Sequence, residues 1–548
     1  MTDKIEAEND EVVEVDPGTG DTDDVSAEDD AAQAPTIQRA QENLLDRLLY
    51  KGVLPRYAFP TDVASFYVFD KENSTRHDTK YRYAPGQGLS VALTQYAPGK
   101  VVWVDGKEWI SGAIYSPFRG DLFEAWDQRR RYFECRVCHY ARHFSQEEAE
   151  PGDERDCPAC DGEGTFGKAM NWMRPPGFAH PVDQDPGTSP DDQPARSYAT
   201  RAKLVAGGPA QAADWQLLTN SLQQTFQRDT LVVTNTGPRG EGYSYCTRCG
   251  LIEPTALPTH RVNGQHKKPF PDDQEPDCRG SAHTRGLVLG TDFISDVLLI
   301  RVKVESPLTL RPDLLATQVA LRTIAEALTI AATYRLEIEE TEVQAEFRPA
   351  LTQSVNDGLE AEIYLYDTLA GGAGFTRQIY NYGLSIFEDT LQRLENCPAG
   401  CDESCYKCLR SFRNRFEHAQ LDRRLGASVL RYLLYGEAPV PDSERLKQSA
   451  NRLFADLETK GVEGVTFERN VVIPIPGIGD TVAPILATRG DRRWIFAVRG
   501  PLTRDLAPTP ELNDAKDYQA VVPVRLIDDM VISRNLPAAS EEVIACLK

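Results

Sequence analysis

The sequence predicts an α+β multidomain protein in which zinc-ribbon and zinc-knuckle modules sit on a mixed α/β scaffold, with a small C-terminal α/β domain. Three observations support this fold class. The 548 residues are enough for three or four domains of ordinary size. Eleven of the twelve cysteines fall into three tight groups. Between and beyond these groups, apolar runs with strand and helix periodicity alternate along the chain.

The composition and the cysteine positions divide the chain into five predicted segments. We expect a disordered acidic tail (1–36), an N-terminal α/β region with a hairpin (37–130), a zinc-knuckle region with two sites and an Asp/Pro-rich loop at 181–197 (131–290), a domain around a four-cysteine site (291–436) and a C-terminal α/β docking domain (441–548).

The net charge of −23 is distributed unevenly. Residues 1–35 hold thirteen acidic residues and one base, Lys4, and no aromatic residue. This composition is typical of a solvated, disordered tail; a regulator that mimics DNA is the alternative. About half of the negative charge lies in this tail, so the rest of the chain can still carry local basic patches.

Hydropathy predicts no membrane-spanning helix, because no run of about 18 uncharged apolar residues occurs. The best stretch, Leu287–Val304, is interrupted by aspartate, arginine and lysine. The N-terminus also lacks the basic-then-apolar pattern of a signal peptide. We therefore expect a cytoplasmic protein.

The first cysteine group consists of two Cys-x-x-Cys pairs, Cys135/Cys138 and Cys157/Cys160, with eighteen residues between the pairs. Each pair can form a tight knuckle, and four thiolates complete the tetrahedron that Zn²⁺ prefers. The spacing predicts a zinc ribbon. His139 and His143 lie nearby, but four cysteines already satisfy the ion.

The second group begins with the knuckle motif Cys246-Thr-Arg-Cys249-Gly250, and Cys278 is the obvious third ligand. His283, His266 and His260 compete for the fourth position. We favour His283, because only four residues separate it from Cys278 and the two would close a short loop.

The third group is Cys397, Cys401, Cys405 and Cys408, four cysteines within twelve residues. Such a run can wrap one metal ion, and we favour zinc over an iron–sulfur cluster because the spacing differs from the ferredoxin pattern. Closed sets of four ligands are structural rather than catalytic. The three groups together predict about three Zn²⁺ ions.

Periodicity gives the expected order of elements. Before the second cysteine group we expect a helix at Ile37–Leu49, then an apolar run at Val63–Phe69. Strands are expected within 89–116, where Asp105-Gly106 is a hairpin turn between two apolar runs. After it we expect a strand at Val297–Val304, a helix at Pro312–Tyr334, a strand at Glu360–Tyr366 and helices at Thr376–Asn396 and Asp422–Leu434. In the C-terminal domain we expect a helix at Asp442–Thr459 and four strands, near Phe467–Val472, Val482–Ala487, Trp494–Val498 and Val521–Leu526.

A glycine-rich segment, Gly371-Gly-Ala-Gly374, lies between a predicted strand and a predicted helix. Such a segment can bind phosphate at the helix N-terminus. However, it lacks the G-x-G-x-x-G spacing, and no Walker motif occurs in the chain. We favour a tight turn, with approach to a DNA phosphate left open.

Two arginine clusters, each next to a cysteine group, are candidate nucleic-acid contacts. The first is interleaved with Tyr132 and Phe133, and the second with Phe412 and Phe416. Arginines with aromatic residues can hold phosphates and stack on bases; a solvated face or a protein interface is the alternative. The candidate residues are Arg129, Arg130, Arg131, Arg410, Arg413 and Arg415.

These motifs resemble a known family. The run Leu365-Tyr-Asp367, Gly371-Gly-Ala-Gly374 and the third cysteine group are similar to the zinc-binding domain of MrfA-like superfamily 2 DNA helicases. Together with the segment Leu48–Pro60 and the separate ribbon at Cys135, they resemble the DrmB family, the helicase-associated subunits of the DISARM anti-phage system. The resemblance covers roughly residues 40–435. It implies a helicase partner, DrmA, and DNA as the shared ligand.

We therefore expect a zinc-binding accessory subunit that is not itself an enzyme, with the ATPase in the helicase partner. The alternative is a nuclease or DNA-processing enzyme that uses the C-terminal domain. There, a helix followed by a strand with Asp480 is similar to a restriction-nuclease core, but Ala497-Val498-Arg499 stands where that core needs an acid and a lysine.

Overall fold

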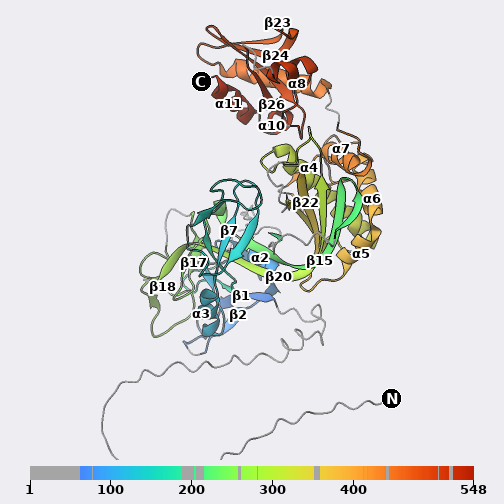
Figure 1. Cartoon of the computed structure of the whole chain (residues 1–548). Helices are drawn as coiled ribbons and strands as arrows, with labels where there is room; N and C mark the ends of the chain where they lie inside the picture. Colours follow the sequence, from blue (N-terminus) through green and yellow to red (C-terminus); the bar gives the residue numbers. More distant parts are fainter. Residues whose placement is uncertain are drawn as a thin grey trace, which may run out of the picture. The chain divides into compact units, whose positions relative to one another are not determined.

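The computed structural model describes residues 62–76, 78–187, 203–204, 215–256, 261–280, 282–350, 358–411, 413–415, 417–439, 443–503, 505–517 and 522–547. The chain divides into two units, 1–53 and 54–548. The predicted acidic tail and the predicted helix at 37–49 lie outside the described residues. The second unit is a mixed α/β assembly with several cysteine knuckles, which confirms the predicted fold class (Figure 1).

Two long strands, β15 (Leu222–Asn235) and β20 (His283–Lys303), lie next to each other in the largest sheet of the second unit. They pair antiparallel along their whole overlap, from Leu222 opposite Val302 to Asn235 opposite Leu289. The predicted strand at 297–304 is therefore only the last third of β20. On the outer edge of β15 lie β13 (Lys203–Leu204) and β14 (Gln216–Thr219).

The two halves of β20 have different neighbours. Its second half pairs with β22 (Glu360–Asp367), which in turn pairs with β21 (Val343–Pro349). Its first half pairs with β11 (Met170–Met173) and β16 (Tyr243–Cys246). Because one continuous strand belongs to both regions, the knuckle-bearing half and the helix-covered half share one eleven-stranded sheet.

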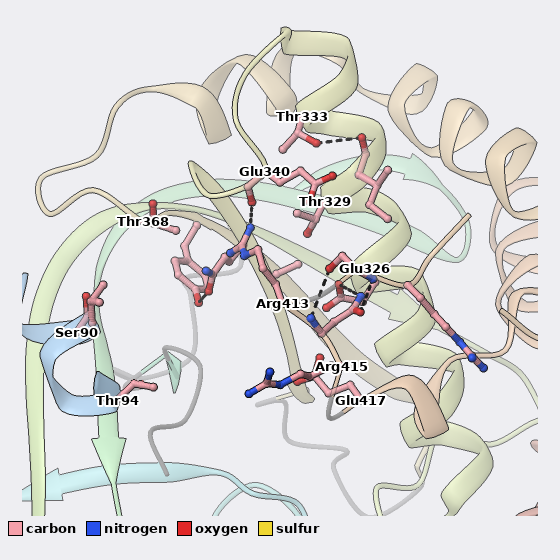
Figure 2. A pocket seen from close by; sticks show the side chains of 18 of the residues that line it. Ser90, Thr94, Glu326, Thr329, Thr333, Glu340, Thr368, Arg413, Arg415 and Glu417 are labelled. Atoms are coloured by element: carbon pink, nitrogen blue, oxygen red, sulfur yellow. Dashed lines mark hydrogen bonds between the residues drawn. The ribbon is translucent and has the colours of Figure 1, made fainter. Parts of the chain in front are cut away.

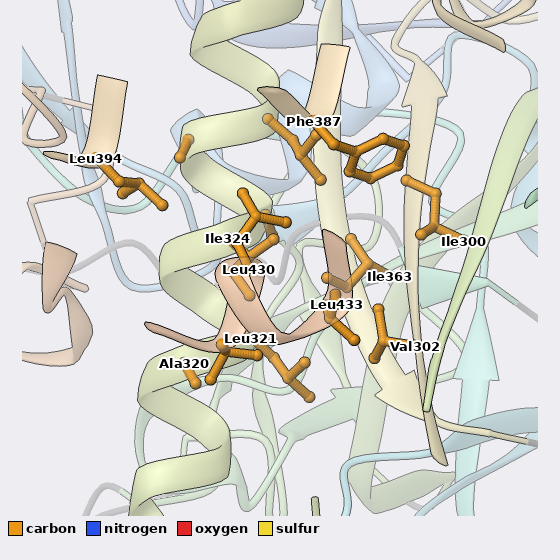
Figure 3. Packing of buried hydrophobic residues seen from close by; sticks show 14 of the residues in the cluster. Ile300, Val302, Ala320, Leu321, Ile324, Ile363, Phe387, Leu394, Leu430 and Leu433 are labelled. Carbon is orange, nitrogen blue, oxygen red and sulfur yellow. The ribbon is translucent and has the colours of Figure 1, made fainter. Parts of the chain in front are cut away.

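Helices cover one face of the second half of this sheet. They are α4 (Leu315–Leu336), α5 (Phe375–Tyr382), α6 (Leu384–Glu395) and α7 (Arg423–Tyr435). Figure 3 shows Ile300 and Val302, alternate residues of β20, near Phe387 of α6 and Leu433 of α7, in the same hydrophobic core as Leu321 and Ile324 of α4. This alternation is expected for a strand that is buried on both faces.

The other face of the sheet packs on the N-terminal part of the second unit. The apolar run Val63–Phe69 forms strand β1. It pairs with β2 (Tyr81–Tyr83), β3 (Gly86–Gly88) and β12 (Phe178–Ala179), and β12 pairs with β6 (Ala113–Ile114). The hairpin of β4 (Val101–Val104) and β5 (Lys107–Ile110) turns at Asp105 and Gly106. Both turn residues have positive φ, 53° and 69°, as a two-residue hairpin turn requires.

Two predicted elements have different boundaries or type. Residues 89–95 form a helix, α2 (Leu89–Gln95), instead of a strand; its buried Leu89, Ala92 and Leu93 follow helical spacing. The predicted helix at 376–396 is two helices, because Gly383 adopts φ 55° and ψ −132° between α5 and α6. The long helix α4 begins at Leu315, three residues after the proline that was expected in its first turn.

The knuckle region adds short strands that hold the cysteines. β7 (Arg130–Glu134) pairs with β8 (Ala141–Phe144) and β11. The remaining short elements of this region are α3 (Arg119–Asp127), β9 (Glu154–Arg155), β10 (Phe166–Gly167), β17 (Ile252–Pro254), β18 (His266–Lys267) and β19 (Asp277–Cys278). Of the predicted loop at 181–197, only residues up to Gly187 are described.

The C-terminal residues build a separate four-stranded sheet in the order β23–β24–β25–β26. Its strands are Thr466–Ile475, Gly479–Arg489, Arg492–Arg499 and Val524–Asp528, and only the last pair is parallel. One face packs on α8 (Ser443–Lys460), α10 (Asp529–Arg534) and α11 (Leu536–Cys546), and the other on α9 (Pro510–Asp517). The predicted helix and four strands of this region are present.

One described helix, α4, is long and apolar enough to cross a membrane by length and composition. A search for wholly uncharged runs does not detect it, because the helix contains charged residues. In the structure 78% of its most apolar window is buried, and the helix forms the centre of the largest hydrophobic core. It is a core helix of this fold.

Candidate metal centres and the adjoining polar pocket

The first cysteine group comes together as predicted from its spacing. Cys135 follows β7, and the Cys138 and Cys157 sulfurs lie 3.6 Å apart, while those of Cys135 and Cys160 lie 3.7 Å apart. The backbone N–H groups of Val137 and Ala159 donate to the first sulfur of each knuckle, at 3.3 and 3.4 Å. This knuckle geometry stabilises thiolates. His139 and His143 do not belong to the ligand set.

The second group contains a different histidine from the predicted one. Cys246, Cys249 and Cys278 gather with His266, whose Nε2 lies 3.2 Å from the Cys249 sulfur. The short pair β18–β19 places His266 directly opposite Cys278, and opposite residues of an antiparallel pair share a face. The prediction of His283 is wrong, because that side chain is exposed at the start of β20 and lies outside the group. His260 lies outside the described residues.

The hydrogen bond on the far side of His266 fixes which of its nitrogens can bind a metal. Nδ1 lies 2.8 Å from the carbonyl oxygen of Gly264. Since a carbonyl can only accept, Nδ1 carries the proton and Nε2 keeps its lone pair toward the cysteines. Metal-binding histidines are usually held in this way by a second partner.

The third group lies directly after α6. The sulfurs of Cys397, Cys401, Cys405 and Cys408 lie 3.5 to 3.7 Å from their neighbours in the group. Arg423 ties this loop to the helix end: its guanidinium donates to the carbonyl of Cys401 at 2.6 Å and to that of Leu394 at 3.0 Å. Arg423 is therefore a positioning residue for the knuckle.

All three groups fit Zn²⁺. Zn–S bonds of about 2.3 Å in a tetrahedron place the sulfurs about 3.8 Å apart, and the sulfur–sulfur contacts here span 3.5 to 3.8 Å. Four protein ligands leave no open position, so these centres would stabilise loops rather than activate water. Among the described residues no further group of His, Cys, Asp and Glu is close enough to hold a metal.

The glycine-rich segment is a turn whose helix terminus is already occupied. The carboxylate of Asp367, which is fully buried, accepts from the backbone N–H groups of Ala373, Phe375 and Thr376 at 2.7, 3.1 and 2.9 Å. These donors would otherwise be available to a phosphate. A phosphate site at the start of α5 is therefore excluded by this chain's own aspartate.

The first arginine cluster is engaged within the protein. Arg131 is only 5% exposed, and it bonds to the Ala149 carbonyl and to Asn171. Arg130 pairs with Asp292 at 2.9 Å, and Arg129 stacks on Trp126 at 4.5 Å. The prediction that Arg131 contacts nucleic acid is wrong, because burial leaves it no surface for a phosphate.

The second cluster lies beside the third cysteine group and lines a cavity of about 890 Å³. Arg413 and Arg415 are exposed there, whereas Arg410 bonds to Ser404 at 2.9 Å and is half-buried. Figure 2 shows Arg413 next to Glu340, whose carbonyl it contacts, and Arg415 extending toward the side formed by Ser90 and Thr94 of α2. Phe412 and Phe416 lie outside the described residues.

A buried asparagine orients these two arginines. Asn414, 2% exposed, donates to Glu326 of α4 at 3.1 Å and to the carbonyl of Leu409 at 2.8 Å. Its carbonyl oxygen accepts from the backbone N–H of Ser411 at 2.8 Å. Because residue 414 points inward, its neighbours on both sides, Arg413 and Arg415, are presented to the cavity.

The wall of the cavity that α4 supplies was not predicted from the sequence. Glu326, Thr329 and Thr333 lie on one face of the helix and line the cavity, next to Ile330. They are spaced by three and four residues, so they form a polar stripe along a helix that is mostly apolar and buried. This polar stripe is the sequence feature from which the cavity wall could have been predicted. The helix face opposite an apolar stripe is expected to face solvent or a ligand.

Comparison with known protein families identifies a domain around the third cysteine group. Residues 324–409 match the MrfA Zn-binding domain. The match runs from the middle of α4 to just beyond the third cysteine group, so it contains the four cysteines and the whole polar stripe. The resemblance to the MrfA-like zinc-binding domain is thus confirmed for this part of the chain, and zinc is the metal that the domain name indicates.

The chain is also similar to the Druantia protein DruE of Escherichia coli (strain UMEA 4076-1). The two are 32% identical over 466 residues, which is 80% of this chain and 24% of DruE. The chain thus spans about a quarter of the length of this relative.

Among solved structures, the chain matches the DUF1998 helicase MrfA. The DNA-bound form gives 10% identity and a TM-score of 0.32 over 70% of this chain and 38% of that one. The form without DNA gives a TM-score of 0.24. The prediction that the chain is not an enzyme is contradicted, because the solved structure that it matches is described as that of a helicase.

Proposed function

We propose that the chain is the zinc-bearing, DNA-holding part of a helicase-type enzyme that acts in bacterial anti-phage defence in the cytoplasm. In its finer form, the chain is a DrmB-type component of a DISARM-like system and works with a superfamily 2 helicase of the DrmA type. The likeness to DruE and the MrfA Zn-binding domain support the coarser form.

One structural observation carries this proposal: Arg413 and Arg415 are presented to a large cavity by an anchored loop that begins at the third cysteine group. Exposed arginines on a rigid support bind phosphates without sequence preference. The knuckle and Asn414 supply the rigidity. Lys407 of the knuckle also lines the cavity and adds a third cation.

The runner-up function, a nuclease in the C-terminal sheet, gains no support. At the position where a restriction-type core needs lysine, Arg499 is 8% exposed and pairs with Asp528 at 2.7 Å. Asp480 is exposed on β24. None of the metal-capable groups among the described residues lies in this sheet.

The test combines the purified chain with the superfamily 2 helicase of its host's defence locus. We expect the two to co-elute in gel filtration and the mixture to separate a DNA duplex in the presence of ATP faster than the helicase alone. Replacing Cys405 with Ser should remove one zinc ion and abolish the stimulation, while Cys546→Ser, at an exposed cysteine outside the three groups, should not. Equal strand separation with and without the chain would refute the proposal.

A further inference from the structure

The cavity beside the third cysteine group has the size and lining of a ligand site. Its volume of about 890 Å³ lies within the range of about 300–1,000 Å³ found for small-ligand pockets. Residues from α2, α4, β21 and the loop after the knuckle meet around it. α2 is held in place here, because Asn235 at the end of β15 donates to the carbonyl of Leu93 at 2.6 Å.

One side of the cavity is cationic. It is lined by Lys407, Arg413 and Arg415, from the knuckle and the loop that follows. On the α2 side, Lys100 donates to the carbonyl of Thr94 at 2.9 Å. Burial lowers the pKa of Lys100, and the charge of Arg415 lowers it further.

The other side is rich in hydrogen-bonding groups, and the carboxylate residues Glu326, Glu340 and Glu417 also line the cavity. Three hydroxyl groups donate to backbone carbonyls: Thr329 to Ala325 at 3.0 Å, Thr333 to Ile330 at 3.1 Å and Thr368 to Thr341 at 2.8 Å. Their oxygens are thereby kept as acceptors.

An amide complements these acceptors. The Gln344 oxygen accepts from the Tyr366 hydroxyl at 2.8 Å, which turns the amide so that its NH₂ is left to donate. The wall thus offers donors and acceptors side by side, as the edge of a nucleobase requires.

An exposed aromatic residue lies at the cavity. Tyr406, on the knuckle between Cys405 and Lys407, is 70% exposed and lines the cavity. Its ring is held edge-on to His418 with centroids 5.4 Å apart, so one ring face is not covered by this contact. Aromatic faces of this kind stack on unpaired bases.

We infer that this cavity takes up one nucleotide of a DNA strand, with the phosphate at Arg413 and Arg415 and the base against the hydroxyl and amide wall. The inference rests on the proposed DNA-holding function and names its site. It requires one base to leave the stack, which costs least in single-stranded DNA. Tyr406 would stack on the neighbouring base at the entrance.

The test uses single-stranded oligonucleotides in which 2-aminopurine replaces one base at successive positions, bound to the full chain together with its helicase. 2-Aminopurine fluorescence rises when the base leaves the stack. We expect a rise at one position only. Thr94→Trp and, as an independent variant, Ser90→Trp should fill the cavity and remove that rise, whereas the matched control Thr94→Ser should keep it.

The affinity of the Trp variants for the oligonucleotide should fall about fivefold or more, the equivalent of one base stack. The salt slope should fall as well, because the phosphate held in the cavity is lost together with the base. Normal salt-dependent binding of the wild-type protein without a position-specific rise would overturn the inference and leave the proposed function intact. Absence of DNA binding by the wild-type protein would overturn the proposed function itself. Binding of free deoxyadenosine monophosphate that the oligonucleotide does not displace would also overturn the inference.

Discussion

The amide of Asn414 donates to the carboxylate of Glu326 over 3.1 Å, although 88 residues separate them in sequence. This bond joins the core helix α4 to the loop that follows the third cysteine group. Both partners are buried, at 2% and 8% exposure. Through this bond, the knuckle and the polar stripe of α4 become two walls of one cavity.

Removing this anchor should loosen the loop. Asn414→Leu leaves the Glu326 carboxylate buried without this donor, which should cost about 1–3 kcal/mol of unfolding free energy. It should also weaken DNA binding, because Arg413 and Arg415 lose their orientation. Urea unfolding and DNA titration measure both effects. Asn451→Leu on the exposed side of α8 is the control and should change neither.

Two histidine variants test which histidine is the fourth ligand of the second metal centre. His266→Ala should lower the zinc content by about one ion per chain, because Nε2 of His266 lies against the Cys249 sulfur. His283→Ala, at an exposed position, should retain the full content. Elemental analysis of both purified variants decides the matter; loss of zinc only in the His283 variant would restore the prediction made from sequence.

Replacing Asp367 should destabilise the glycine-rich turn. Asp367→Asn keeps the shape but replaces one accepting oxygen by an NH₂ group that faces backbone donors. Hydrogen bonds to a charged acceptor are worth about 1.5–3 kcal/mol, so we expect a loss of that order in the free energy of unfolding. Asp389→Asn, a surface partner of Arg335, should cost less than about 1 kcal/mol. Equal losses in the two variants would argue against this role of Asp367.

The free energy of unfolding should decrease as the pH falls through a range set by the pKa of His143. Burial lowers its pKa from the ordinary value of 6.5 to about 4, and its ring packs on Trp172 with centroids 4.4 Å apart. Between these two values the unfolded chain binds a proton that the folded chain does not, so stability decreases as the pH falls from about 6.5 to about 4.

The variant His143→Phe keeps the ring and removes the titration. The pH dependence of the unfolding midpoint should therefore flatten in this window, whereas the exposed His283→Gln should leave it as in the wild type. An unchanged slope in His143→Phe would show that other groups cause the acid sensitivity.

The sequence predicted much of this fold because its strongest signals are local. The hairpin at Asp105-Gly106 and the apolar runs of β1 and β22 depend on neighbouring residues, and so do the tight cysteine spacings. The failures are long-range. His266 reaches its group through the pairing of β18 with β19, and no spacing rule contains that pairing.

The cavity could not be derived from the sequence for the same reason. Its walls come from α2, α4 and the loop after Cys408, which are brought together by the two-sided burial of β20. Arg131 and Arg413 looked alike as members of arginine-rich clusters; only burial separates the one that bonds to Asn171 from the one that faces the cavity.

The salt dependence of DNA binding tests the central claim most directly. Arg413→Ala combined with Arg415→Ala should weaken binding without sequence preference, and should lower the log–log salt slope by about 0.7–0.9 for each phosphate that the variant no longer binds. The control variant, Arg492→Ala with Arg493→Ala, removes two exposed charges from β25 and should keep the wild-type slope. If the Arg413/Arg415 variant bound DNA with the wild-type affinity and slope, with its zinc content intact, the account of this cavity as a DNA-holding site would be contradicted.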